Sequence, residues 1–145
     1  MSRTHDVAWA AGFFDGEGFV TIQKRKSKAK SGIYYESYYL RIGINHVAIE
    51  PLQEIQRIFG GTLRQQTKHT VQGNRHQRHS WQASCSQAKE ILIQMMPYFH
   101  NKQKAAEIGI ELQNTMSENK IKTSDQVQLY RALLKDKLQK LNKMD

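Results

Sequence analysis

Hydrophobic and polar positions along the chain follow two periods, one near 3.6 residues and one near 2 residues. The longer period is typical of helices that bury one face, and the shorter period is typical of strands that bury one face. Thr4 is a plausible N-cap for the first helix, and Thr123 with Gln126 forms a capping box for the last. The pattern predicts a helix at 5–15, strands at 19–25 and 34–45, a helix at 51–59, strands at 62–67 and 79–84, and helices at 86–96, 101–116 and 124–142.

This order of elements predicts one α+β domain of the αββαββα type. Antiparallel hairpins that are grouped with helices usually form a sheet whose one face the helices cover. The other face is then open to solvent or to a ligand. A single domain is expected over residues 1–145, with a core at about 5–116 and a C-terminal helical extension at about 123–142.

The balance of charge narrows the choice of ligand. The chain holds 22 Lys and Arg against 13 Asp and Glu, a formal net charge of +9. A basic balance of this size is typical of nucleic-acid binders, but ribosomal and membrane-surface proteins share it. Basic charge therefore suggests nucleic acid as a partner and specifies no activity.

Cysteine usage and hydropathy predict an intracellular protein. Cys85 is the single cysteine, which excludes a disulfide within the chain and fits a reducing compartment. No apolar stretch follows a basic start, as in a signal peptide, and no run of about 18 apolar residues could span a membrane. We therefore expect neither secretion nor a membrane partner.

One face of the first helix carries very small side chains. The residues that share this face, at the spacing i, i+3, i+4 and i+7, are Ala8, Ala11, Gly12 and Asp15. Small residues let two helix backbones approach closely, a steric effect documented mainly in membrane helices. Because one chain has one such helix, we expect it to pack against the same helix of a second chain around a two-fold axis. Trp9 is expected to pack into the core of its own chain.

A carboxylate stands where this helix is expected to end. Glu17 lies between Gly16 and Gly18, and glycines let a phosphate and a metal ion approach the backbone closely. Mg²⁺ is typically held by one or two carboxylates together with waters and phosphate oxygens. Taken alone, this segment would more often be an ordinary acidic turn after a helix. The small-residue helix face, the hairpins and the basic charge together favour a metal site.

The same segment resembles the LAGLIDADG motif of homing endonucleases. It reads Ala10-Ala11-Gly12-Phe13-Phe14-Asp15-Gly16-Glu17-Gly18, with alanine at the first position where leucine is usual. The element order and the later segment from Pro97-Tyr98-Phe99 to Lys102-Gln103-Lys104 extend the resemblance over about 5–116. The resemblance implies a saddle-shaped antiparallel sheet, a homodimer of the single-motif type, and Mg²⁺- or Mn²⁺-dependent hydrolysis of double-stranded DNA. The target would be long and nearly palindromic, the cuts would leave short 3′ overhangs, and no small-molecule substrate is implied.

The resemblance also implies roles for single residues. Glu17 would hold the metal ion, with the carbonyl of Gly16 as a further ligand. Lys102 would approach the scissile phosphate and stabilise the transition state, with Lys104 as the alternative. His46 stands where relatives often have glutamine or another polar residue near active-site water, and it would order this water or take its proton. A solvated lysine and a surface histidine at a strand end are the plain alternatives.

The two hairpins are the expected DNA-binding surface, since the major groove of B-DNA admits a two-stranded β-ribbon. If the apolar positions point to the core, alternation places the polar positions on the open face. Any exposed sheet shows an alternating polar face, but this one carries basic and amide groups and no acid. The expected contacts are Thr21, Gln23, Arg25, Tyr39, Arg41, Gly43, Arg64, Gln66, Ser80 and Gln82.

Two basic loops, at 24–30 and 68–79, are expected to reach DNA phosphates. Such contacts add salt dependence and no sequence information. Flexible, solvated hairpin tips are the alternative. The expected phosphate contacts are Lys26, Lys28, Lys68, Arg75 and Arg78.

Three functions compete. The favoured one is a metal-dependent homing endonuclease, acting in the cytoplasm of a bacterial or phage host or in an organelle. The second is a cleavage-inactive member of the fold that binds DNA or RNA, as an intron maturase or a regulator. Glu17 argues against it, because such members would be expected to lack the acid. The third is a generic basic RNA-binding protein, which the coherent order of elements disfavours.

The C-terminal helix is expected either to brace the core or to touch DNA.

Overall fold

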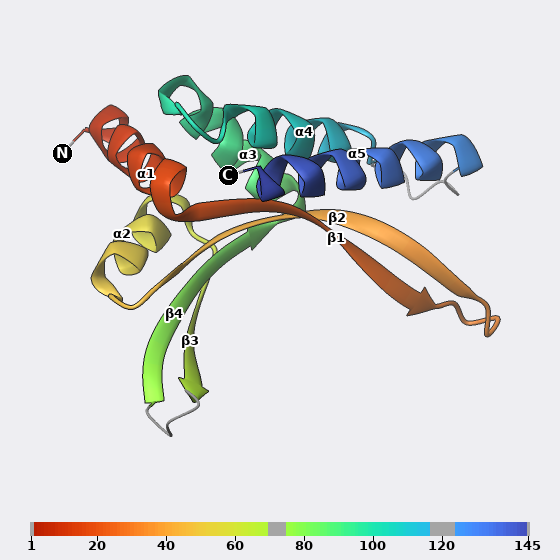
Figure 1. Ribbon diagram of the computed structural model, residues 1–145, viewed down its shortest axis with the longest axis horizontal. Coiled ribbons are helices and arrows are strands. Elements are labelled where there is room, and N and C mark those ends of the chain that lie inside the picture. The colour runs from red at the N-terminus through yellow and green to blue at the C-terminus, as the bar shows by residue number, and fades with distance from the viewer. Residues whose placement is uncertain (1, 70–74, 117–123, 145) are drawn as a thin grey trace.

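The structure is a computed structural model that describes residues 2–69, 75–116 and 124–144. Its elements confirm the predicted order and the α+β class (Figure 1). They are α1 (Arg3–Glu17), β1 (Gly18–Lys28), β2 (Tyr34–His46), α2 (Glu50–Phe59), β3 (Thr62–His69), β4 (Arg75–Ser84), α3 (Cys85–Met95), the 3₁₀ turn η1 (Met96–Tyr98), α4 (Gln103–Asn114) and α5 (Asp125–Lys143). No helix in the described ranges is both long enough and apolar enough to cross a membrane.

The four strands form one antiparallel sheet in the order β1-β2-β4-β3. β1 pairs along its whole length with β2, from Gly18 opposite Ile44 to Lys28 opposite Tyr34, whereas β2 pairs with β4 only from Arg41 to His46. Beyond this short central seam the two hairpins diverge, and Figure 1 shows them bending away from the helices on either side. The expected saddle shape is therefore confirmed.

The helices lie on one side of the sheet, as expected (Figure 1). Leu40, Ile42 and Ile44 of β2 are fully buried beneath them, together with Trp81 of β4. The indole N–H of Trp81 donates to the carbonyl of Gly60 at 2.8 Å, which satisfies its one polar group inside the core. Because side chains alternate along a strand, the intervening polar positions face the open side.

Helix α5 lies along the helical side of the β1–β2 hairpin (Figure 1). Its Leu138 is 1% exposed and belongs to the core. Two side-chain amides tie α5 to the strand backbones. Gln128 donates to the carbonyl of Glu36 at 2.8 Å, and Asn142 donates to that of Val20 at 3.1 Å. Of the two roles expected for the C-terminal helix, bracing the core is confirmed.

The helix N-caps differ from those predicted. Ser2, and not Thr4, caps α1, because its side-chain oxygen accepts a hydrogen bond from the backbone N–H of His5. Ser124 has the same role in α5. Thr123, which was predicted to form the capping box there, lies outside the described residues.

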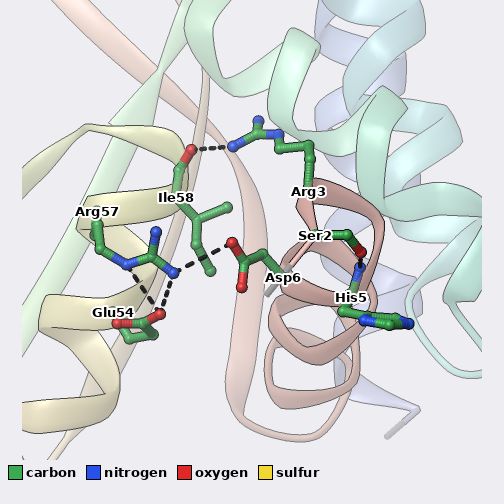
Figure 2. Close-up of polar contacts among 7 residues, drawn as sticks. All are labelled: Ser2, Arg3, His5, Asp6, Glu54, Arg57 and Ile58. Atoms are coloured by element: carbon green, nitrogen blue, oxygen red, sulfur yellow. Dashed lines mark hydrogen bonds and ion pairs between the residues drawn. The ribbon is translucent and has the colours of Figure 1, made fainter.

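A cluster of charged side chains fixes the start of α1 against α2 (Figure 2), and one further hydrogen bond connects it to α3. Arg57 of α2 makes an ion pair with Asp6 of α1 at 3.2 Å. Asp6 is only 7% exposed, so this partner compensates a carboxylate that would be costly to bury alone. Arg3 donates to the carbonyl of Ile58 at 2.5 Å and to the side chain of Gln94 in α3 at 2.7 Å. The cluster therefore orients the helix that carries the candidate site.

Candidate active site and nucleic-acid interface

Helix α1 brings Glu17 to the point where the helix joins the sheet. Glu17 is the last residue of α1, and Gly18 opens β1. Gly18 must be small, because a Cβ there would lie 2.5 Å from the ring of Phe14. The Glu17 side chain is exposed, and within the described ranges its carboxylate makes no hydrogen bond or ion pair. The carboxylate is therefore free to bind a ligand.

The oxygen donors at this helix end fit a hard divalent cation. The Glu17 carboxylate is free, and Gly16 beside it is exposed, with nothing within 4 Å of where a Cβ would be. Among the described side chains, no group of three or more His, Cys, Asp or Glu forms a metal cage. A cation at Glu17 would thus complete its coordination with water and phosphate oxygens, which is how Mg²⁺ is usually held.

The carboxylate of Asp15 is hydrogen-bonded within its own chain, although the sequence predicted Asp15 at a contact between two chains. Its carboxylate accepts hydrogen bonds from three consecutive backbone N–H groups, those of His100 at 3.0 Å, Asn101 at 2.9 Å and Lys102 at 2.7 Å. Burial by itself raises the pKa of Asp15, but the three hydrogen bonds and the charge of Lys102 outweigh it and lower the pKa overall. Asp15 is therefore a structural carboxylate, unlike Glu17.

Lys102 lies beside the end of α1, as a catalytic lysine would have to. It is the N-cap residue of α4, and its ammonium group donates to the carbonyl of Asp15 at 3.3 Å. The fold thus brings Lys102 to the helix turn that ends in Glu17. Lys104, the alternative, is exposed and lines a groove between α4 and α5 together with Lys137 and Lys140.

His46 ends β2 close to α1, with its ring 5.5 Å from that of Phe13 between centroids. Its Nδ1 accepts a hydrogen bond from the backbone N–H of Ala48 at 2.9 Å. A neutral imidazole that accepts at Nδ1 carries its proton on Nε2, so Nε2 is a donor. Of the two roles predicted for His46, this geometry fits the ordering of a water molecule and disfavours taking a proton.

The free face of α1 differs from the predicted one. Ala11 is fully buried within the single chain, because it lies on the side of α1 that packs against the core. Trp9 was predicted to be in the core, and this is wrong, since it is 42% exposed. Cβ atoms on Gly12 and Gly16 would meet nothing within 4 Å. Of the residues predicted at the dimer contact, Ala8 and Gly12 are at least partly exposed. The exposed face of α1 also includes Trp9 and Gly16.

The open face of the sheet holds most of the predicted polar contacts. The register pairs Thr21 with Arg41 and Gln23 with Tyr39. The guanidinium of Arg25 lies 4.6 Å from the ring centroid of Tyr39. Among the described side chains at these alternating positions, none is acidic. The predicted contact residues that are exposed or partly exposed are Thr21, Gln23, Arg25, Tyr39, Arg41, Arg64, Arg78 and Gln82.

Two predicted DNA contacts are covered by neighbouring side chains. A Cβ on Gly43 would lie 2.6 Å from the Phe19 ring, so Gly43 is buried under an aromatic side chain that the sequence analysis overlooked. Ser80 is 1% exposed and accepts a hydrogen bond from Gln82 at 3.2 Å. In contrast, Asn45 is exposed, and the sequence-based prediction did not include it among the residues of the open face. Continuing the alternation of β2 by one more step would have found it.

Lys26 and Lys28 of the first hairpin belong to a strand and not to a loop. β1 extends to Lys28, and alternation places Lys26 and Lys28 on the side of the sheet opposite Arg25. Their ammonium groups lie 5.2 Å and 5.7 Å from the ring centroid of Tyr34. The predicted contacts whose side chains lie outside the described part of the structure are Gln66, Lys68 and Arg75.

A saddle-shaped antiparallel sheet with helices on one face, and with a motif helix that ends at the sheet, is the homing endonuclease fold. The chain belongs to the LAGLIDADG endonuclease family, whose family model matches residues 10–107. No curated protein sequence matches the chain significantly.

Several solved structures share this fold. The homing endonuclease I-CvuI, in complex with its target, has a TM-score of 0.71 at 20% identity, over 96% of this chain and 83% of that chain. The archaeal intron-encoded homing endonuclease I-Vdi141I, complexed with DNA, has a TM-score of 0.73 at 14% identity, over 97% and 86% of the two chains. The homing endonuclease I-TnaI has a TM-score of 0.60 at 17% identity, over 94% and 93%. At these identities the likeness establishes the fold alone.

Proposed function

We propose that the chain is a site-specific, double-strand DNA endonuclease that acts as a homodimer and requires a divalent cation. One observation carries the proposal. Among the described residues, the carboxylate of Glu17 is free, and the ammonium of Lys102 binds the Asp15 carbonyl in the same last turn of α1, where α1 joins a sheet whose open face is basic. Family membership supports it.

Similar structures support DNA as the ligand. I-CvuI is described in complex with its target and I-Vdi141I in complex with DNA. In this chain the surface that would bind DNA is the open face of the sheet, where Arg and Gln side chains can make paired hydrogen bonds to guanine and adenine. The Nε of Arg41 is buried and has no hydrogen-bond partner among the described atoms, so the free protein leaves a donor of this face unsatisfied.

Each residue of the site has a distinct task in phosphodiester hydrolysis. Glu17 and the Gly16 carbonyl would hold the cation. When bound, such an ion makes a water ligand more acidic and stabilises negative charge on a phosphate. Lys102 would turn its ammonium from the Asp15 carbonyl to a phosphate oxygen, where positive charge stabilises the transition state. His46 would donate from Nε2 to orient the attacking water.

Cutting both strands requires two such sites, and one chain has one Glu17. The open face of α1 supports a symmetric dimer, because Gly12 and Gly16 leave room for a second helix backbone and Trp9 exposes apolar surface. A two-fold axis along this face would place one Glu17 at each strand of a nearly palindromic site.

The proposal can be tested without knowing the target. Random-sequence DNA circles are incubated with the protein over a range of Mg²⁺ concentrations, and newly formed ends are ligated and sequenced. The range extends well above 2 mM, because I-CvuI with 2 mM Mg is described with uncleaved DNA. We expect ends to be enriched at one long, nearly palindromic sequence. DNA binding in Ca²⁺ without any enriched ends would contradict nuclease activity and would favour a cleavage-inactive binding protein.

A further inference from the structure

One carboxylate joins the end of one helix to the start of another. Asp15 of α1 accepts hydrogen bonds from the backbone N–H groups of His100, Asn101 and Lys102 at 2.7–3.0 Å. The N–H groups of His100 and Asn101 precede α4, and that of Lys102 belongs to its N-cap residue. A usual capping side chain accepts instead from the second or third residue of the helix. Asp15 therefore anchors the segment that leads into α4, and it does so from a distant part of the sequence.

The contact is reciprocal. The ammonium of Lys102 donates to the main-chain carbonyl of Asp15 at 3.3 Å, and the amide of Asn101 reaches the same oxygen at 3.5 Å. Carbonyl groups in the last turn of a helix also lack partners within the helix. The end of α1 and the segment that leads into α4 thus bind each other across a separation of 87 residues in the sequence.

We propose that Asp15 is a positioning residue, which sets the backbone of residues 100–102 so that Lys102 is in register with Glu17. The proposal rests on the proposed function, in which Glu17 and Lys102 act on the same phosphate. The hydrogen bonds of the carboxylate go to main-chain groups only. It therefore fixes where the Lys102 side chain begins, and it leaves the ammonium free to leave Asp15 and reach DNA.

We expect the loss of the hydrogen bonds between Asp15 and residues 100–102 to lower the rate of the chemical step. A misplacement of about 1 Å in a catalytic group can lower a rate about 100-fold. We expect Asp15→Ala to lower the single-turnover cleavage rate constant by about this factor, while DNA affinity in Ca²⁺ changes no more than about twofold. Asp15→Asn keeps one acceptor oxygen in the same place, so it should retain more of the rate than Asp15→Ala.

A double-mutant cycle with Lys102→Ala tests whether Asp15 acts through Lys102. If it does, adding Asp15→Ala to Lys102→Ala changes the rate by no more than about twofold, because the positioned group is already gone. Asp6→Asn is the matched control, since Asp6 is also an α1 carboxylate held within the chain, but by Arg57. Its effect should multiply with that of Lys102→Ala. If the rate reductions of Asp15→Ala and Lys102→Ala multiply in the double variant, the proposal is overturned. Asp15→Asn provides the same cycle if Asp15→Ala does not fold.

Amide hydrogen exchange gives a readout that does not depend on cleavage. We expect the amides of residues 100–102 to exchange faster in Asp15→Asn than in wild type or in Asp6→Asn. Unchanged exchange would overturn the proposal. If the wild-type protein cuts no DNA, the proposed function fails and the positioning role of Asp15 in cleavage fails with it. Hydrogen exchange then still reports whether Asp15 holds the backbone of residues 100–102. A failure of the proposed function can thus be distinguished from a failure of the proposal about Asp15.

Discussion

Asp15 and Glu17 are two acids of one motif, two residues apart, and the fold gives them opposite surroundings. Asp15 is saturated by backbone N–H donors, whereas the carboxylate of Glu17 has no partner among the described residues. A carboxylate that is already bound gains little from a cation, and a free one gains most. This contrast assigns the structural role to one acid and makes the other available for metal.

His46 provides a test at the scale of one residue. Because its Nδ1 accepts from Ala48, the ring offers a donor and no base at Nε2. Glutamine can also donate, so His46→Gln should keep most of the cleavage rate. His46→Ala should lower the rate about tenfold, the equivalent of one hydrogen bond. Single-turnover rates at saturating protein measure both. An equal loss in the two variants would instead favour a general base.

At the scale of elements, the sequence predicts the helices and strands well and their long-range contacts poorly. Local periodicity and the glycine and proline breaks define α1 to α5, because those signals lie within each element. The partners of Asp15 lie 85 to 87 residues further along the chain, so no local pattern could reveal them. The burial of Ala11 and the exposure of Trp9 depend likewise on how α1 is rotated against its neighbours. The rotation is set by contacts such as that of Arg57 with Asp6.

The β1–β2 hairpin should separate base recognition from phosphate contacts. Gln23 lies on the open face, whereas Lys28 is exposed at the tip of the hairpin, where its long side chain can reach a phosphate at the edge of the groove. We expect Gln23→Ala to relax preference at one position of the target. Lys28→Ala should weaken all DNA binding and lower the slope of log affinity against log salt by about 1. Fluorescence anisotropy over a salt series, with matched and mismatched duplexes, distinguishes these effects. Uniform weakening by both variants would argue against base reading by Gln23.

Helix α5 should contribute to stability through its buried side. Leu138 is 1% exposed, and Leu129 of the same helix is 64% exposed. Leu138→Ala is expected to lower the free energy of unfolding by about 2–5 kcal/mol. Leu129→Ala, the control, should change it by less than about 0.5 kcal/mol. Urea denaturation measures both, and equal effects would contradict the bracing role of α5.

At the scale of the whole molecule, the dimer can be tested at Gly12. A Cβ there would lie within 4 Å of no atom in the described part of the chain, so Gly12→Leu should fold at least as stably as wild type. In the proposed dimer the same side chain would separate the two α1 helices. We expect the wild type to have the mass of a dimer by analytical ultracentrifugation, and Gly12→Leu to have that of a monomer and to lose double-strand cleavage.

The control for this change is Gln139→Leu, which adds the same side chain at an exposed position of α5. It should leave the dimer intact. A monomeric wild type, with or without DNA, would exclude the symmetric arrangement around α1.

The most direct measurement is the cleavage rate of Glu17→Gln on the selected target, compared with wild type in Mg²⁺, alongside the DNA affinity of both in Ca²⁺. Glutamine keeps the shape of the side chain and removes the charge that would hold the cation. We expect cleavage to be abolished and affinity to be largely retained. Cleavage by Glu17→Gln at the wild-type rate would contradict the central role of this carboxylate.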